Sequence, residues 1–278
     1  MSNSQTPYPV VGPMKQLWSE LSDFVARQCS GRDASHGHQH MATVADNSVK
    51  IYQMMLDDAG VSAANLIAAD VATEVTTPRR RDSPTSELLL DLIIIVAWLH
   101  DVNDSKYASA ANQQAIDDFL AGIHNRYPKF HHVGEADFIR NINTVIYYIS
   151  YSKEVKLFGK LSEVSTTSFA RRWSEVLPED LILVRNIVSD ADKLESIGEI
   201  GVQRCLEYSM HVNPDIKDYN THLKHVFDHY DDKLQHLYPH YIVTPAGKRL
   251  AEPRHQIMAD IITTLKLYYP QALASGQH

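Results

Sequence analysis

The sequence of 278 residues has only two cysteines, Cys29 and Cys205, too few for a disulfide framework or a cysteine-rich zinc site. Glycine is also scarce, which disfavours a β architecture with many turns. The longest apolar run, residues 88–99, is interrupted by Asp91 and is shorter than the about 20 residues that cross a bilayer. Residues 1–14 are polar and lack the apolar core of an export signal. We therefore expect a cytoplasmic protein with reduced thiols and no membrane partner.

The formal net charge is −8, and an acidic surface repels phosphate backbones. A nucleic-acid polymer is therefore not expected as a partner, whereas a small phosphate compound in a local basic pocket is compatible with this charge. One stretch, residues 73–86, combines two prolines with Arg79, Arg80 and Arg81. We interpret it as a surface loop, and a lid that brings one of these arginines to an anionic substrate is the alternative.

Helical periodicity dominates the chain, and no segment alternates apolar and polar residues as a strand does. The sequence therefore predicts an all-α fold with irregular stretches at residues 73–86 and 151–167. The nearly all-apolar segment 87–99 is predicted to be a buried central helix. The expected helices span residues 14–26, 36–56, 87–99, 108–123, 134–148, 169–176, 178–191, 198–211, 219–237 and 245–268.

Fifteen histidines are present, and histidine is both the commonest metal ligand and a frequent acid or base. Three segments place histidine or aspartate at a helix end: SHGHQH at residues 35–40, AWLHDVNDSKY at residues 97–107 and IVSDADKL at residues 187–194. An ionised aspartate beside such apolar runs needs a partner, and a metal ion is a good one. His36 and His40 are four residues apart and so share a helix face.

His40, His100, Asp101 and Asp192 together would form a shell of two imidazoles and two carboxylates. Such a shell suits one divalent ion of Mn, Mg, Fe, Co or Zn, with positions left for water and substrate. Each residue also has a structural explanation. Asp101 could cap the next helix, His40 could be a half-buried helix residue, and Asp192 could form an ion pair with Lys193 or Arg185.

These segments, taken in order, resemble the H…HD…D signature of the HD-domain metal-dependent phosphohydrolases. LHDVNDSKY at residues 99–107 is similar to the HD-x-x-D-x-K-Y block of that family. IVSDADKLESIGEIGVQR at residues 187–204 resembles the D-A-D-x-L-x-x-x-G-x-x-G-x-x-R block of one bacterial and plant subgroup, and residues 227–255 resemble the tail of that subgroup. The resemblance covers about residues 33–270.

The resemblance implies a single helical bundle around one central metal ion, with His40, His100, Asp101 and Asp192 as its ligands. In the family the aspartate two residues before the leucine is the ligand, which selects Asp192 over Asp190. The implied domain organisation is an N-terminal helix and tail in residues 1–30, the HD domain in residues 31–270 and a C-terminal tail in residues 271–278.

The implied activity is hydrolysis of a small phosphate ester, above all a nucleotide, by metal-activated water. Four further residues receive catalytic roles from the resemblance. His36 would lie near the phosphate, Lys106 would neutralise its charge, and Asp104 or Asp190 would orient water or carry a proton.

Two other functions stay open, namely a catalytically silent module that binds metal or nucleotide and an HD-type oxygenase with two irons. The subgroup has a histidine in the segment that reads Tyr148-Ile149-Ser150-Tyr151 here, and its loss argues against a second metal. Arg204 follows Gly198 and Gly201 and could be a phosphate anchor or an internal ion-pair partner.

Overall fold

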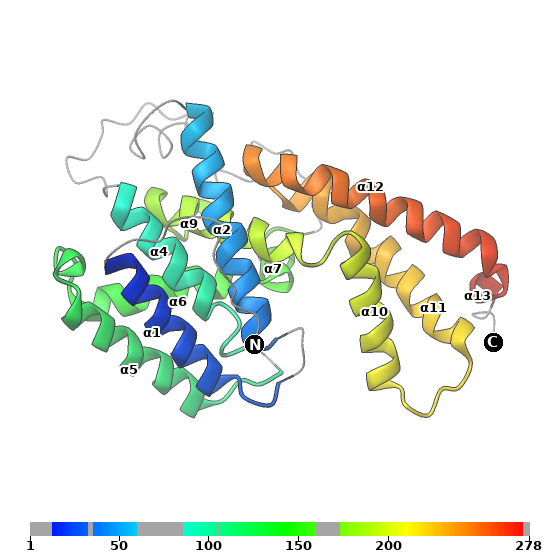
Figure 1. Ribbon diagram of the computed structural model, residues 1–278, viewed down its shortest axis with the longest axis horizontal. Helices are drawn as coiled ribbons and strands as arrows, with labels where there is room; N and C mark the ends of the chain where they lie inside the picture. Colours follow the sequence, from blue (N-terminus) through cyan, green and yellow to red (C-terminus); the bar gives the residue numbers. More distant parts are fainter. Residues whose placement is uncertain (1–12, 33–35, 60–85, 105, 160–172, 275–278) are drawn as a thin grey trace. The chain divides into compact units, whose positions relative to one another are not determined.

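The computed structural model describes residues 13–32, 36–59, 86–104, 106–159 and 173–274 (Figure 1). Within these residues all regular structure is helical, which confirms the all-α prediction. The chain divides into two compact units, residues 1–189 and 190–278, and the division falls inside one continuous helix, α9 (Glu179–Leu194). The domain boundaries expected near residues 30 and 270 do not coincide with this division, and they stay predictions.

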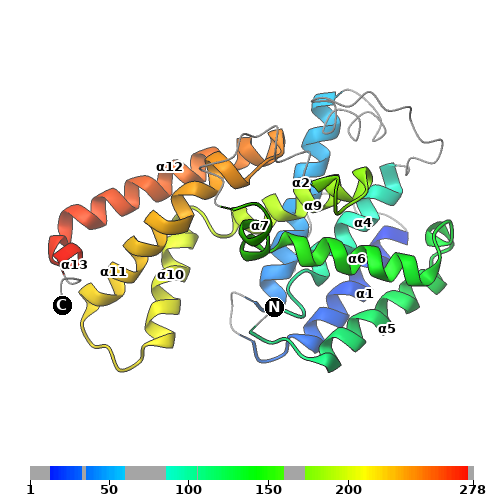
Figure 2. The same ribbon diagram turned by 180° about the vertical axis from the view of Figure 1, so that it is seen from behind.

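The first unit is built around α4 (Ser86–Leu99), the apolar segment predicted to be a central helix. Residues 88–100 are all buried, and the helix packs against α1, α2 and α6. Figure 1 views α4 from the side of α1 and α2, and Figure 2 views it from the side of α6. A helix that is apolar all round has to be covered in this way. The unit also contains α1 (Pro13–Gln28), α2 (His38–Ala59), α5 (Ala110–Arg126), the 3₁₀ turn η1 (Pro128–Phe130), α6 (Glu135–Ile149), α7 (Tyr151–Phe158) and most of α9.

Asp91, the one charge within the apolar run of α4, is 1% exposed and forms an ion pair with Lys129. Burial raises the pKa of the Asp91 carboxyl, whereas Lys129 lowers it. A charge in such surroundings requires a partner, and Lys129 supplies it from the turn η1.

The second unit contains helices α10 (Glu199–Val212), α11 (Tyr219–His229), α12 (Pro245–Tyr268) and α13 (Pro270–Ala274), with α10 packed against α11 and α12. The bounds of α12 agree with the prediction, because Thr244 caps the helix and Pro245 suits its first turn. The helix predicted over residues 219–237 is α-helical only as far as His229. Two π-helical segments follow it, η3 (Tyr230–Leu234) and η4 (Leu237–Tyr241).

The loop predicted over residues 151–167 is wrong at its start, because α7 occupies Tyr151–Phe158. Of the helix predicted over residues 169–176, Trp173 is helical and the following three residues form a turn. Most of the predicted loop at residues 73–86, with Arg79, Arg80 and Arg81, lies outside the described residues.

α7 has a clear packing role that its weak apolar pattern concealed. Its Glu154 is fully buried and lies 2.8 Å from the guanidinium of Arg185, which is also fully buried. Arg185 donates to the carbonyl oxygen of Tyr148 at 3.0 Å, and its guanidinium lies 4.1 Å from the centre of the Trp173 ring. Four residues along α9, the hydroxyl of Ser189 donates to the carbonyl oxygen of Ile149. α9 is thus joined to the C-terminal end of α6 and to α7.

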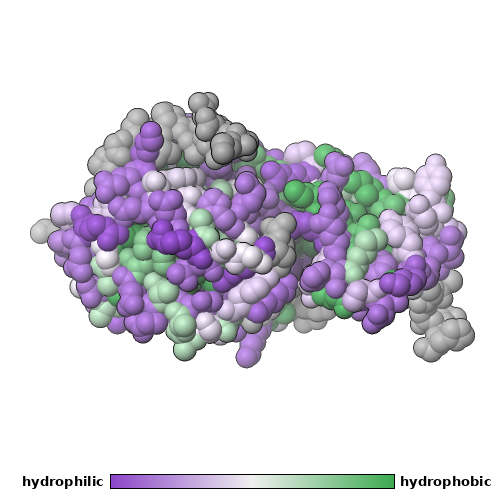
Figure 3. Space-filling model, turned by 60° about the horizontal axis from the view of Figure 1, so that its bottom comes forward, coloured by the Kyte–Doolittle hydropathy of each residue, from purple (hydrophilic) through white to green (hydrophobic). Residues whose placement is uncertain are grey.

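No helix among the described residues is both long enough and apolar enough to span a membrane. Cys29 and Cys205 are free thiols. Figure 3 shows one face of the molecule, which is largely hydrophilic with smaller apolar areas between the polar residues.

Glu154→Gln tests the buried ion pair. The variant leaves the Arg185 guanidinium in an apolar environment without its counter-charge, so we expect a loss of about 3–5 kcal/mol in the free energy of unfolding. Urea denaturation followed by circular dichroism measures this loss. Asp137→Asn is the control, because Asp137 pairs with Arg140 at an exposed position and should contribute about 0–1 kcal/mol. Equal effects of the two substitutions would contradict the assignment.

Candidate metal centre

His100 follows directly after α4, where the helix leaves its last carbonyl groups without intrahelical partners. Its ring folds back so that Nδ1 lies 2.8 Å from the carbonyl oxygen of Ala97. A carbonyl oxygen only accepts hydrogen bonds, so Nδ1 must carry the proton and donate it. In the neutral ring Nε2 is therefore the unprotonated nitrogen, and this is the form of imidazole that binds a metal ion. The side chain of His100 is 7% exposed.

His40 comes from the first turn of α2 and is 5% exposed. α2 begins at His38, two residues later than predicted, and the amide of His40 donates to the carbonyl oxygen of Gly37 at 3.1 Å. His38, between His36 and His40, has a separate contact, because its Nε2 lies 2.8 Å from the hydroxyl of Ser22 in α1. Of the three histidines in this segment, only His40 joins the cluster described next.

Asp192 lies in the last turn of α9, and two arginines secure the end of this helix. Arg254 donates to the carbonyl oxygen of Leu194 at 2.7 Å, and Arg204 donates to that of Glu195 at 3.1 Å. Carbonyl groups at a helix C-terminus carry partial negative charge, so cationic donors stabilise them. Of the two explanations left open for Arg204, the observed contact favours an internal one, although the partner is a backbone carbonyl group.

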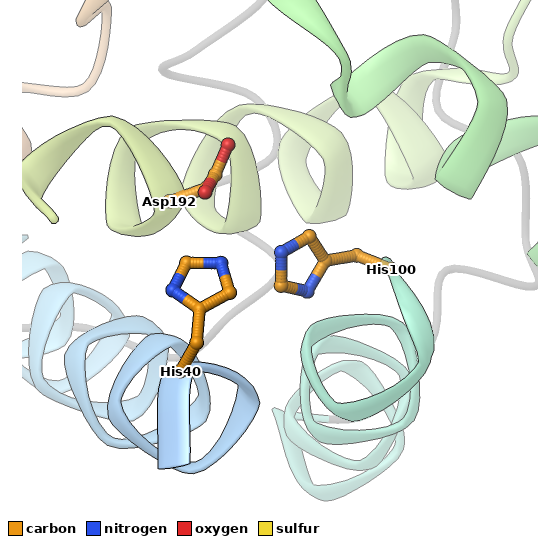
Figure 4. A group of neighbouring side chains, drawn as sticks. All are labelled: His40, His100 and Asp192. Carbon is orange, nitrogen blue, oxygen red and sulfur yellow. The ribbon is translucent and has the colours of Figure 1, made fainter. Parts of the chain in front are cut away.

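One ligand atom from each of His40, His100 and Asp192 lies within 4.8 Å of the others. Figure 4 shows the three side chains converging from α2, from the end of α4 and from α9. Two neutral imidazoles and one carboxylate are ligands that borderline and hard divalent ions accept. Ligand atoms at about 2.1 Å from an ion are at most about 4.2 Å apart, so a small closure would complete the shell. The two histidines are buried and Asp192 is partly exposed, so these residues fit a metal ion.

Asp101, the fourth predicted ligand, does not belong to this three-residue cluster but lies beside it. Its Oδ2 is 3.7 Å from Nε2 of His40, and its side chain is 22% exposed. Adjacent residues at a helix end point in different directions, but His100 and Asp101 both lie beside the ring of His40. In the described geometry Asp101 is placed to orient the His40 ring, as carboxylates around metal centres commonly do. Its role as a ligand stays a prediction.

His36 and Asp104 form a second, parallel pair of imidazole and carboxylate. Nε2 of His36 lies 4.0 Å from Oδ1 of Asp104, and these side chains are 15% and 25% exposed. Oδ1 of Asp104 also accepts a hydrogen bond from the amide of Lys106 at 2.9 Å. Lys106 itself is exposed. His36 and Asp104 are therefore neighbours, and Lys106 contacts Asp104 through its backbone amide.

Asp190 differs from the other predicted site residues, because it is fully buried and its carboxylate is used for packing. The carboxylate accepts hydrogen bonds from the amides of Val243 and Thr244 and from the Thr244 hydroxyl, the last at 2.7 Å. Burial raises the pKa of Asp190 to about 6, although the hydrogen bonds from Thr244 and Val243 lower it. This geometry favours a structural role at the start of α12 over the predicted transfer of a substrate proton.

The sequence contains no motif for Arg32, yet Arg32 contacts the turn that follows His100. It donates to the carbonyl oxygens of Asp101 at 3.0 Å and Val102 at 2.7 Å. The contact joins positions about seventy residues apart. The sequence does not distinguish an arginine with this role from one on the surface. Two other histidines, His131 and His132, contact the backbone carbonyls of His124 and Lys129.

The sequence matches no family model and no curated protein. Solved structures do match the fold. A structural-genomics protein from Lactobacillus plantarum is 21% identical, with a TM-score of 0.53 over 92% of this chain and 98% of that one. YpgQ of Bacillus subtilis is 17% identical, with a TM-score of 0.50 over 93% of this chain and 98% of its own. These similarities show a shared helical fold.

The His40, His100 and Asp192 cluster predicts one divalent ion per chain. Elemental analysis of protein loaded with Mn²⁺ or Zn²⁺ and then desalted should give a ratio near one for the wild type. His100→Ala and Asp192→Ala should each lower the ratio to below about one tenth, because two remaining ligands hold a divalent ion weakly. The control His132→Ala removes an exposed histidine and should leave the ratio unchanged. Retention of the ion by both ligand variants would place it elsewhere.

Gly247→Ala tests the structural role of Asp190. A Cβ at this position would lie 2.5 Å from Oδ2 of Asp190 and 2.7 Å from Oγ1 of Thr244. We expect a loss of about 1–3 kcal/mol in the free energy of unfolding, measured by urea denaturation. The matched control is Gly134→Ala, where no heavy atom lies within 4 Å of the added carbon and φ is −62°. A loss no greater than that of the control would show that the carboxylate is not held as described.

Proposed function

We propose that this protein is a metal-dependent phosphohydrolase that acts on a small phosphate ester, with a nucleotide as the expected substrate class. The observation that carries the proposal is the convergence of His40, His100 and Asp192, together with the His36–Asp104 pair, whose members lie four residues along the chain from His40 and from His100. A metal cluster alone fits a binding module equally well. The adjoining imidazole and carboxylate are groups that move protons, and they favour an enzyme.

His40, His100 and Asp192 would hold the ion, with Asp101 as a further candidate ligand. When bound, a divalent ion supplies an activated water and offsets the negative charge of a phosphoryl group. The fixed tautomer of His100 keeps its lone pair available without a rearrangement of the ring. Asp192 is the partly exposed member of the cluster, so a small anion would approach from its side.

His36 and Asp104 would handle the proton. The carboxylate of Asp104 lies 4.0 Å from Nε2 of His36, so an imidazole and a carboxylate stand together as a candidate acid–base pair. A protonated His36 can stabilise charge on a phosphoryl oxygen or donate its Nε2 proton to a leaving oxygen. Lys106 adds an exposed positive charge at the same turn, which attracts a phosphate to a protein whose net charge is −8.

The nucleotide expectation depends on the likeness of the sequence blocks to the HD-domain phosphohydrolases. The cluster of His40, His100 and Asp192 supports the more general part of the proposal, namely a divalent ion at the site.

The test is phosphate or pyrophosphate release from a panel of nucleoside mono-, di- and triphosphates and sugar phosphates. Protein stripped with a chelator should be inactive, and Mn²⁺, Mg²⁺, Co²⁺, Fe²⁺ or Zn²⁺ should restore turnover. We expect Asp104→Asn to lower kcat by about 10²–10⁴-fold, because it removes a group that accepts a proton. His132→Ala, an exposed histidine outside the cluster, is the control and should keep wild-type kcat.

Activity that survives in the double variant His100→Ala/Asp101→Ala would refute the role of the metal centre. One ion per chain with no turnover on the whole panel would instead favour the silent binding module.

A further inference from the structure

The turn after α4 carries four of the predicted site residues: His100, Asp101, Asp104 and Lys106. Its own hydrogen bonds are short-range, from the amide of Val102 to the carbonyl oxygen of Leu99 at 3.1 Å and from the amide of Asp104 to that of Asp101 at 3.2 Å. Isolated turns of this kind adopt several conformations in solution, because one local bond offsets little conformational entropy. A contact from outside the turn is needed to fix it.

Side chains of α5 contact the later part of the turn, at Asn103 and Tyr107. Arg32 contacts its first part, next to His100, with both terminal nitrogens of its guanidinium. Nη1 donates to the carbonyl oxygen of Asp101 and Nη2 to that of Val102, so one planar group holds two consecutive peptide units. The guanidinium also lies 4.4 Å from the centre of the Tyr107 ring, which ends the same turn. A planar fork stacked on an aromatic ring is a geometry that lysine cannot reproduce.

We propose that Arg32 is a positioning residue of the metal centre, which fixes the turn so that His100 and Asp101 point toward His40. The inference rests on the metal centre of the proposed function. The carbonyl oxygen of Asp101 belongs to the peptide unit between Asp101 and Val102. Movement of this unit would change the direction of the Asp101 side chain and that of the neighbouring His100 side chain. Arg32 does not ligate the ion, because its terminal donors are used on carbonyl oxygens.

The contact also places the positive charge of Arg32 next to the turn that carries the carboxylates of Asp101 and Asp104. The guanidinium binds the backbone of Asp101, while the side chain of Asp101 extends toward His40. Arg32→Lys keeps this charge but loses the fork, so the comparison of Arg32→Lys with Arg32→Ala separates geometry from electrostatics.

The experiment is isothermal titration of chelator-stripped protein with Mn²⁺ alone. We expect the dissociation constant to rise about 10–100-fold in Arg32→Ala, as it does when residues that orient metal ligands are removed. Arg32→Lys should show most of the same loss. The control Arg27→Ala removes an exposed arginine from the last turn of α1 and should stay within about twofold of the wild type.

Metal affinity is the decisive measurement, because a residue that only stabilises the fold would lower the melting temperature and leave the dissociation constant unchanged. If Arg32→Ala does not fold, Arg32→Lys decides. Wild-type affinity in the folded variants would refute the role of Arg32 alone. A wild-type protein that binds no divalent ion would refute the metal centre and this role together. Tight Mn²⁺ binding that is lost in the Arg32 variants, with no phosphatase activity in any, would support the positioning role and contradict the proposed reaction.

Discussion

The hydrogen bond from Nδ1 of His100 to the carbonyl oxygen of Ala97 is the interaction on which the candidate site depends. It satisfies a carbonyl group at the end of the buried helix α4, and it also fixes the tautomer of the neutral ring. The end of α4 and the chemistry of the site are therefore set by the same contact. α4 is enclosed by α1, α2 and α6, and His100, which follows it directly, is buried as well.

Much of the fold follows from local patterns in the sequence. α4 and α12 lie close to their predicted bounds, because an apolar run and a Thr-Pro start are local signals. His40, His100 and Asp192 were also identifiable, since each stands at the end of an apolar or periodic segment. Their order along the chain resembles a family signature, and the structure brings them together. Residue types and their local spacing were therefore sufficient to predict these helices and these three candidate ligands.

The remainder depends on contacts between distant segments. Asp190 and Asp192 both lie near the C-terminal end of α9, yet Asp190 faces the start of α12 and Asp192 faces the histidines. Two residues change the direction on a helix by about 200°, and the sequence alone does not show which direction is the core. α7 was missed because its stabilising partner, Arg185, lies thirty-one residues further along. Arg32 was missed because its partners are backbone carbonyl groups, which every residue has.

The three converging side chains come from segments that are far apart in the chain, and this has a consequence for biosynthesis. A ribosome has synthesised most of the protein before Asp192 emerges, so the complete ligand set cannot assemble on a shorter nascent chain. Closure of such long loops is opposed by chain entropy until the surrounding helices have packed. Acquisition of an ion with all three ligands would therefore come late in maturation and would mark chains whose N-terminal helices had already assembled correctly.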